Sequence, residues 1–245
     1  MPVMRLPIRL RWIPLIATAL VVATGISLGN WQTRRAEEKL AIEQAIVERS
    51  KLAPIAAASL KPGQQPEEFR RVNAEGEFLA DWPLYLENRP HGAQSGFYLL
   101  MPLRIADSGD IVLVARGWFP RDPADRTRIP DVAVPKGRQH IEGGVRSHAT
   151  RVMQLGEASA VKPGALLQNI DPAAFAAASG LHVHAFIIEQ RNDTHDGLVR
   201  DWPAPSAGVD KHRGYAFQWY ALAAVAFLFY LITGIRSASK RNEQA

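Results

Sequence analysis

The chain has 245 residues, no cysteine and a formal net charge of +5. The missing thiols exclude a disulfide framework, iron–sulfur ligation and thiolate sites for copper or zinc. The basic excess lies in two tails, residues 1–11 and 236–245, because residues 12–235 hold 23 basic and 23 acidic side chains. Nucleic-acid binding is therefore not expected. Basic tails beside apolar segments instead favour a membrane protein with both ends in the cytoplasm.

Residues 12–28 form the first apolar run, and we expect a membrane helix over 12–30. A cleaved signal peptide is the alternative, although no A-x-A pattern closes the run. Gly25 and Gly29 form a G-x-x-x-G, the spacing that lets two helix backbones approach closely. Helix-forming residues continue to about Leu52, so the helix is expected to extend beyond the membrane.

Residues 31–210 are predicted to hold a mainly antiparallel β domain, which begins after a loop over 54–66. From Phe69 onward, apolar residues alternate with polar ones, the period of a half-buried strand. Further strands are expected at 84–86, 97–104, 111–119, 139–145 and 183–190, with a hairpin turn over 107–110. A short helix should follow Asp171, its N-cap, and end at Gly180.

One strand allows a sharper prediction. Counting by two along 111–119 places Arg116 and Trp118 on the same face, on either side of Gly117. We expect Trp118 to be largely buried.

The second apolar run, Tyr215 to Ile235, has 21 residues without a formal charge. As a helix it is about 31 Å long, enough to cross a hydrocarbon core. A transmembrane helix is expected over 211–235, with Tyr215, Trp219 and Tyr220 at the membrane surface. Its Ala216, Ala223 and Ala226 share one face, which favours packing against the first helix. The predicted class is an α+β membrane protein in which two transmembrane helices flank the β domain.

The chain has no Gly-x-Ser-x-Gly, phosphate-binding-loop or His-Glu-x-x-His motif, so an enzyme is not expected. His182 and His184 are two apart on a predicted strand and could share a metal ion; a position at the surface or rim of that strand is the other interpretation. The four remaining histidines outside the second span have no ligand-type neighbours and are expected to be solvated. They are His91, His140, His148 and His195.

His212 lies at the start of the second span between Lys211 and Arg213. Imidazole is a common axial ligand of haem iron, and membrane-surface aromatics would give a flat cofactor an apolar wall. The two cations could pair with haem propionates. Alternatively the cations anchor the helix at the interface and the histidine is incidental. The residues alone leave both interpretations open.

Several sequence blocks resemble those of the surfeit locus protein 1 family. They are Trp31-Gln32 with Arg35 and Lys39, Gly76-x-Phe78, Phe97 to Leu103, Val112 to Pro120, and His212 with Tyr215, Ala216 and Gln218-Trp219-Tyr220. The resemblance runs over nearly the whole chain, in order, with the same two-span layout.

The resemblance implies an assembly factor for a haem–copper terminal oxidase, cytochrome c oxidase, that binds haem a and assists its insertion into subunit I. A haem-free scaffold that stabilises nascent subunit I is the alternative, and a periplasmic enzyme is a distant third. Other oxidase assembly factors and membrane lipid are the further partners expected. Eleven residues precede the first span, too few for a mitochondrial transit segment, so we expect a bacterial inner membrane with the β domain in the periplasm.

The two spans must run antiparallel, which brings the outer end of the first level with the start of the second. Gln32 shares a helix face with the G-x-x-x-G, so we expect it to hydrogen-bond the ring nitrogen of His212 that does not bind iron. Trp219, seven residues after His212, is expected to pack on the macrocycle. The expected cofactor-binding residues are His212, with its iron-ligating nitrogen, and Gln32, Trp219, Tyr215 and Trp31.

Overall fold

The computed structural model describes residues 12–61, 63–125, 128–129, 132–154, 156–203 and 208–242, with side chains up to Arg236. The predicted basic tail at residues 1–11 lies outside the described residues, as does most of the one at 236–245. The chain divides into two compact units. A helical unit comprises residues 1–44 and 204–245, and a β unit comprises residues 45–203.

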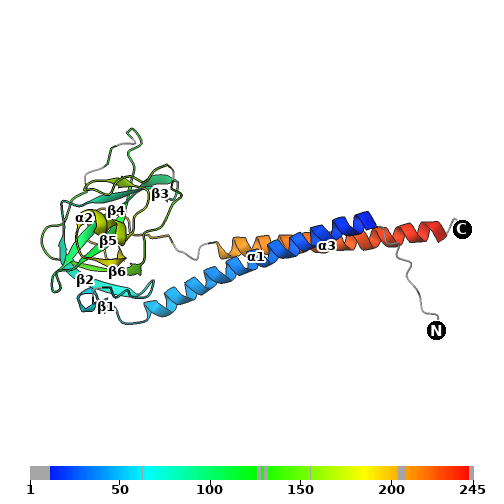
Figure 1. Ribbon diagram of the computed structural model, residues 1–245, viewed down its shortest axis with the longest axis horizontal. Coiled ribbons are helices and arrows are strands. Elements are labelled where there is room, and N and C mark those ends of the chain that lie inside the picture. Colours follow the sequence, from blue (N-terminus) through cyan, green and yellow to red (C-terminus); the bar gives the residue numbers. More distant parts are fainter. Residues whose placement is uncertain are drawn as a thin grey trace. The chain divides into compact units, whose positions relative to one another are not determined.

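The helical unit is a pair of long helices, α1 (Trp12–Ser50) and α3 (Val209–Asn242), which lie side by side in Figure 1. Both are long and apolar enough to cross a membrane. The prediction that the first helix continues beyond the apolar run is confirmed, since α1 ends at Ser50.

Small residues let the two helices approach closely. A Cβ atom added to Gly25 would lie 3.0 Å from the Cβ of Ala223, and one added to Gly29 would lie 2.5 Å from the Tyr220 ring. Ala216 and Ala223 are buried at the same seam. The predicted packing of the G-x-x-x-G against the alanine face is therefore confirmed.

The β unit contains eight strands, one α-helix and one 3₁₀ turn in its described residues. They are β1 (Ile55–Ala56), the 3₁₀ turn η1 (Ala57–Ser59), β2 (Arg71–Phe78), β3 (Leu84–His91), β4 (Gln94–Ile105), β5 (Ile111–Pro120), β6 (Gln139–Arg146), β7 (Leu166–Leu167), α2 (Pro172–Ser179) and β8 (Val183–Gln190). The predicted strands are present, whereas β1 and η1 fall inside the range predicted to be a loop. These two elements are too short to produce a periodic pattern.

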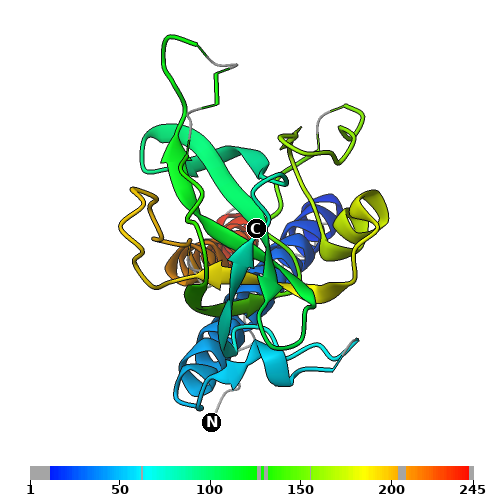
Figure 2. The same ribbon diagram turned by 90° about the vertical axis from the view of Figure 1, so that its left-hand side faces the viewer.

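Five strands close into a barrel in the order β2-β6-β8-β5-β4, because β2 pairs with both β6 and β4. Figure 2 shows these strands wrapped around a common centre. All barrel pairings are antiparallel except β5 with β8. Outside the barrel, β3 pairs antiparallel with β4, and the short β1 and β7 add parallel pairings. The mainly antiparallel prediction is confirmed.

Two hydrophobic clusters stabilise the β unit. One fills the barrel with alternate residues of its strands, including Phe97, Val114 and Phe186. The other covers the opposite face of β3, β4 and β5, where Phe175 of α2 meets Trp82 edge to face at 5.2 Å. As predicted, the carboxylate of Asp171 accepts a hydrogen bond from the Ala174 N–H to cap α2.

A β-bulge corrects the face assigned to Arg116. Leu99 pairs with Gly117 but Leu100 pairs with Ala115, so Arg116 is an extra residue in β5 without a partner opposite. This inserted residue reverses the face of the sheet on which the following side chains of β5 lie. Trp118, only 4% exposed, is buried as predicted, but it joins the outer cluster.

Candidate functional site at the outer end of the helix pair

The polar contact predicted between the helices is present. Nδ1 of His212 in α3 lies 2.7 Å from Oε1 of Gln32 in α1. Gln32 is 9% exposed, although it lies in a helix whose other buried residues are glycine and alanine. A buried amide oxygen needs a donor, so the histidine satisfies Gln32 and ties the two helices together.

This hydrogen bond selects one tautomer of the imidazole. An amide oxygen can only accept, so the proton of a neutral His212 ring resides on Nδ1. The lone pair is then on Nε2, which makes no hydrogen bond within the part of the chain that the structure describes. A neutral imidazole whose second nitrogen is held by a neighbour is the usual arrangement of a metal-ligating histidine.

A second polar contact joins the helices about two turns farther along α3. The Tyr220 hydroxyl donates to Oδ1 of Asn30 at 2.7 Å and lies 3.4 Å from the Thr33 hydroxyl. The Tyr220 ring occupies the space left by the missing side chain of Gly29. Sequence reasoning placed Tyr220 at the membrane surface and missed this contact. In the sequence, Gly29 in the facing helix was the only indication of this Tyr220 contact.

The three predicted aromatic residues differ in burial. Trp31 and Tyr215 are 45% and 53% exposed. Trp219 is half-buried and lines an apolar groove of about 520 Å³ between α1 and α3. Lys211 and Arg213, exposed on either side of His212, make no ion pair with any residue the structure describes. Their ammonium and guanidinium groups are therefore available to an anionic ligand.

Comparison with known proteins identifies the family. The model of the SURF1 family matches residues 19–224, which include most of α1, the whole β unit and the first sixteen residues of α3. The chain belongs to the SURF1 family. The match contains Gln32 and His212 together, so the polar contact lies inside the family's extent and not in an appended segment.

Two relatives span most of the chain, and a third spans about half of it. A SURF1-like protein of Rickettsia bellii is 27% identical over 89% of this chain and 88% of its own length. Surfeit locus protein 1 of Rattus norvegicus is 26% identical over 86% of this chain and 72% of its own. The cytochrome oxidase assembly protein SHY1 of Saccharomyces cerevisiae is 27% identical over 47% of this chain and 30% of its own.

Arg116, which lies in the sequence block Val112 to Pro120, has a structural role in this chain. The fully buried Arg116 guanidinium donates to Asp196 at 2.9 Å, and Arg200 donates to the same carboxylate at 2.6 and 2.7 Å. Burial lowers the pKa of Arg116. Burial would raise the pKa of Asp196, but the hydrogen bonds from Arg200 and the Leu198 N–H outweigh it and hold that pKa below its ordinary value. This ion cluster joins β5 to the segment that follows β8.

His182 immediately precedes β8, and His184 lies within it. No group of three or more metal-ligating side chains suited to an ion occurs among the described residues. His182 is exposed, which agrees with the surface interpretation, whereas His184 is only 3% exposed because strand alternation places it on the inward face with Phe186. Burial lowers the pKa of His184, which lies 3.9 Å from Asp110. His91 was also expected to be solvated but packs on Trp118 at 4.9 Å.

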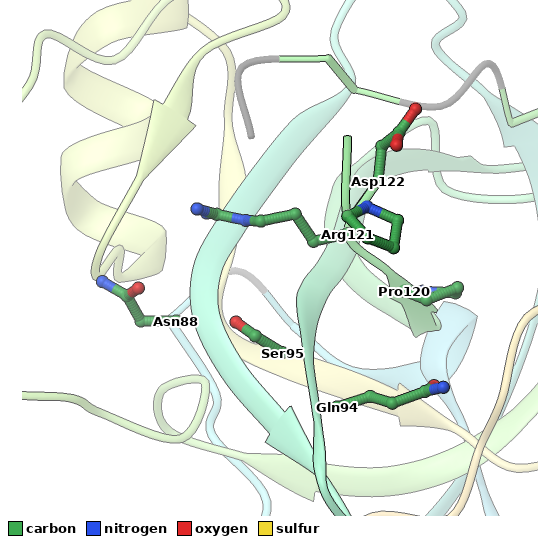
Figure 3. A pocket seen from close by; sticks show the side chains of 7 residues that line it. Asn88, Gln94, Ser95, Pro120, Arg121 and Asp122 are labelled. Carbon is green, nitrogen blue, oxygen red and sulfur yellow. The ribbon is translucent and has the colours of Figure 1, made fainter. Parts of the chain in front are cut away.

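The β unit has an open cavity of about 800 Å³. Arg121 is the only cation among the described residues that line it, and Figure 3 shows this side chain extended toward Asn88, away from Asp122. The Arg121 guanidinium pairs with Glu87 at 3.2 Å and lies 4.7 Å over the Phe97 ring. It already has structural partners, so this cavity is a weaker candidate site than the outer end of the helix pair.

Proposed function

We propose that α1 and α3 cross a membrane. Only 11% and 17% of the residues in their apolar windows are buried, unlike those of a core helix in a soluble protein. Among the described residues, every exposed large hydrophobic side chain except Leu52 and Met153 lies on one of these helices. The basic tails at 1–11 and 236–245 then favour two cytoplasmic termini, with residues 31–210 in the periplasm of a bacterium.

Reporter fusions test this topology. A reporter active only in the cytoplasm should work when fused after Ala245, and one active only in the periplasm should work when inserted at Gly63, which has open space around its Cα. The opposite pattern at either position would contradict the proposed orientation.

Within this topology, we infer that the protein assists assembly of cytochrome c oxidase by holding haem a for insertion into subunit I. The observation that carries the proposal is the His212 ring, whose Nδ1 is held by Gln32 and whose Nε2 is left for a ligand. The yeast relative's description as a cytochrome oxidase assembly protein supports the assembly role. The protein would act as a carrier, together with other assembly factors, and not as a catalyst.

Each residue of the site has a distinct part in this proposal. His212 would hold the haem iron through Nε2, and Gln32 would fix the tautomer and ring orientation. When bound, haem iron would supply the Lewis acid that the imidazole ligates. The cations that flank His212 suit the haem propionates. Trp31, Tyr215 and Trp219 would provide an apolar wall at the membrane surface.

One observation also favours a haem-free scaffold that stabilises subunit I. The same Gln32–His212 hydrogen bond joins the two helices, which is sufficient structural reason for both residues. The two functions differ in what they require of His212, because a scaffold needs only correctly packed helices.

Complementation in the host separates them. Cells that lack this protein should have severalfold less assembled oxidase, measured as oxidase-bound haem a absorbance in membranes, and the wild-type chain should restore it. A His212→Ala chain of equal abundance should fail to restore it. Full rescue by His212→Ala would favour the scaffold, and unchanged oxidase in the deletion strain would contradict both functions.

A further inference from the structure

The apolar groove between α1 and α3 has a use that the proposed haem site does not explain. Its walls are mainly apolar side chains of both helices, which approach each other closely at Gly25. The lining residues are Leu20, Val21, Thr24, Gly25, Trp219, Leu222, Val225, Ala226 and Phe229. A volume of about 520 Å³ falls in the range of small-molecule sites. The groove therefore fits an elongated apolar group.

Helical spacing connects this groove to the His212 end of the pair. On α3, Trp219 follows His212 by seven residues, and Tyr215 precedes the lining residue Leu222 by seven. On α1, Trp31 follows the lining residue Thr24 by seven. Residues seven apart share a helix face. The helix faces that line the groove therefore also carry the exposed aromatic residues Tyr215 and Trp31.

The groove extends away from His212, toward the opposite end of α3. From Trp219 to Phe229 it follows ten residues, which is about 15 Å of helix. A ligand that fills both regions has an anionic head between Lys211 and Arg213, a group that His212 can bind, and a long apolar tail. Haems that carry an isoprenoid chain have this form.

We propose that the groove holds the isoprenoid tail of the haem, so that this protein selects tailed haems over haem b. The inference rests on the proposed function. A lipid acyl chain is also apolar enough to enter, but the haem tail is tethered to a ring held at His212. Because the tail is tethered, it enters the groove in an intramolecular step, and its effective concentration there is high. Inside the bilayer, burial of apolar surface alone contributes little. Van der Waals packing against the preformed groove is therefore what favours binding of the tail.

The test compares three haems on the full-length protein in phosphatidylcholine nanodiscs. Haem b lacks the isoprenoid group, haem o has it, and haem a adds a formyl group. Titrations followed by the change in haem absorbance should show haem o and haem a binding about tenfold more tightly than haem b. The comparison of haem o with haem b isolates the tail from the formyl group.

A matched pair of variants locates the effect. Thr24 is exposed and lines the groove, so Thr24→Phe should fill it and bring the haem o affinity down to that of haem b. Ile26 is 46% exposed two residues away and does not line the groove, so Ile26→Phe should bind like the wild type.

The outcomes separate this inference from the proposed function. If all three haems bind equally and His212→Ala weakens them all, the groove does not hold the tail but the proposed site stands. If no haem binds in a His212-dependent way, the proposed function fails and the inference fails with it. Equal tail selectivity in Thr24→Phe and the wild type would place the tail elsewhere.

Discussion

Replacing His212 with alanine should remove haem from the purified protein while leaving the chain inserted and abundant in the membrane. The substitution deletes the only imidazole at the seam, and Gln32 loses its 2.7 Å partner. The helices retain the Gly25–Ala223 contact and the Tyr220–Asn30 hydrogen bond, so the pair should still form. The measurement is the haem-to-protein ratio after purification from cells that make haem a.

Two controls make this result specific. His195→Ala changes a histidine whose side chain is 91% exposed in the β unit, and it should keep the full haem content. Gln32→Leu removes the acceptor and should weaken haem binding about 10- to 100-fold, whereas Gln32→Glu keeps an acceptor and should weaken it less. Full haem occupancy in His212→Ala would eliminate the ligand assignment and favour the scaffold.

Replacing Trp118 with alanine should lower the free energy of unfolding of the β unit by about 3–5 kcal/mol. The side chain is 4% exposed in the outer cluster and packs on His91. Its indole N–H donates to the Arg89 carbonyl at 2.8 Å, so the variant also leaves that buried acceptor without its partner. Urea unfolding of residues 45–203, followed by circular dichroism, measures the change.

Smaller substitutions divide this loss into its parts. Trp118→Phe keeps an aromatic ring but no donor, and should cost about 1 kcal/mol for the hydrogen bond together with a smaller packing loss. Met153→Ala, at a side chain 81% exposed, should leave stability unchanged. A Trp118→Ala protein as stable as the wild type would mean that the bulge and the outer cluster are wrongly assigned.

Local patterns were sufficient to predict the helices, the six longer strands and the contact at the site. The Gln32–His212 hydrogen bond followed from seven-residue spacing because both helices keep a regular period over their full length. Asp171 and Gly180 predicted the ends of α2 because capping depends on neighbouring residues only.

Long-range pairing and irregular backbone could not be predicted in this way. Counting by two assumes an uninterrupted strand, so the extra residue at Arg116 reversed the face of everything after it. The partner of Arg116 is Asp196, 80 positions along the chain, and no local signal joins them. Closure of the barrel through β2 and β4 depends on tertiary pairing in the same way.

The optical spectrum of the wild-type protein tests the central claim most directly. The chain should be purified from membranes of cells that make haem a, and its haem identified and quantified as the pyridine haemochrome. A His212 ring held by Gln32 with Nε2 available predicts haem a in the purified protein. A haem-free protein from membranes rich in haem a would contradict the claim and leave the scaffold as the function.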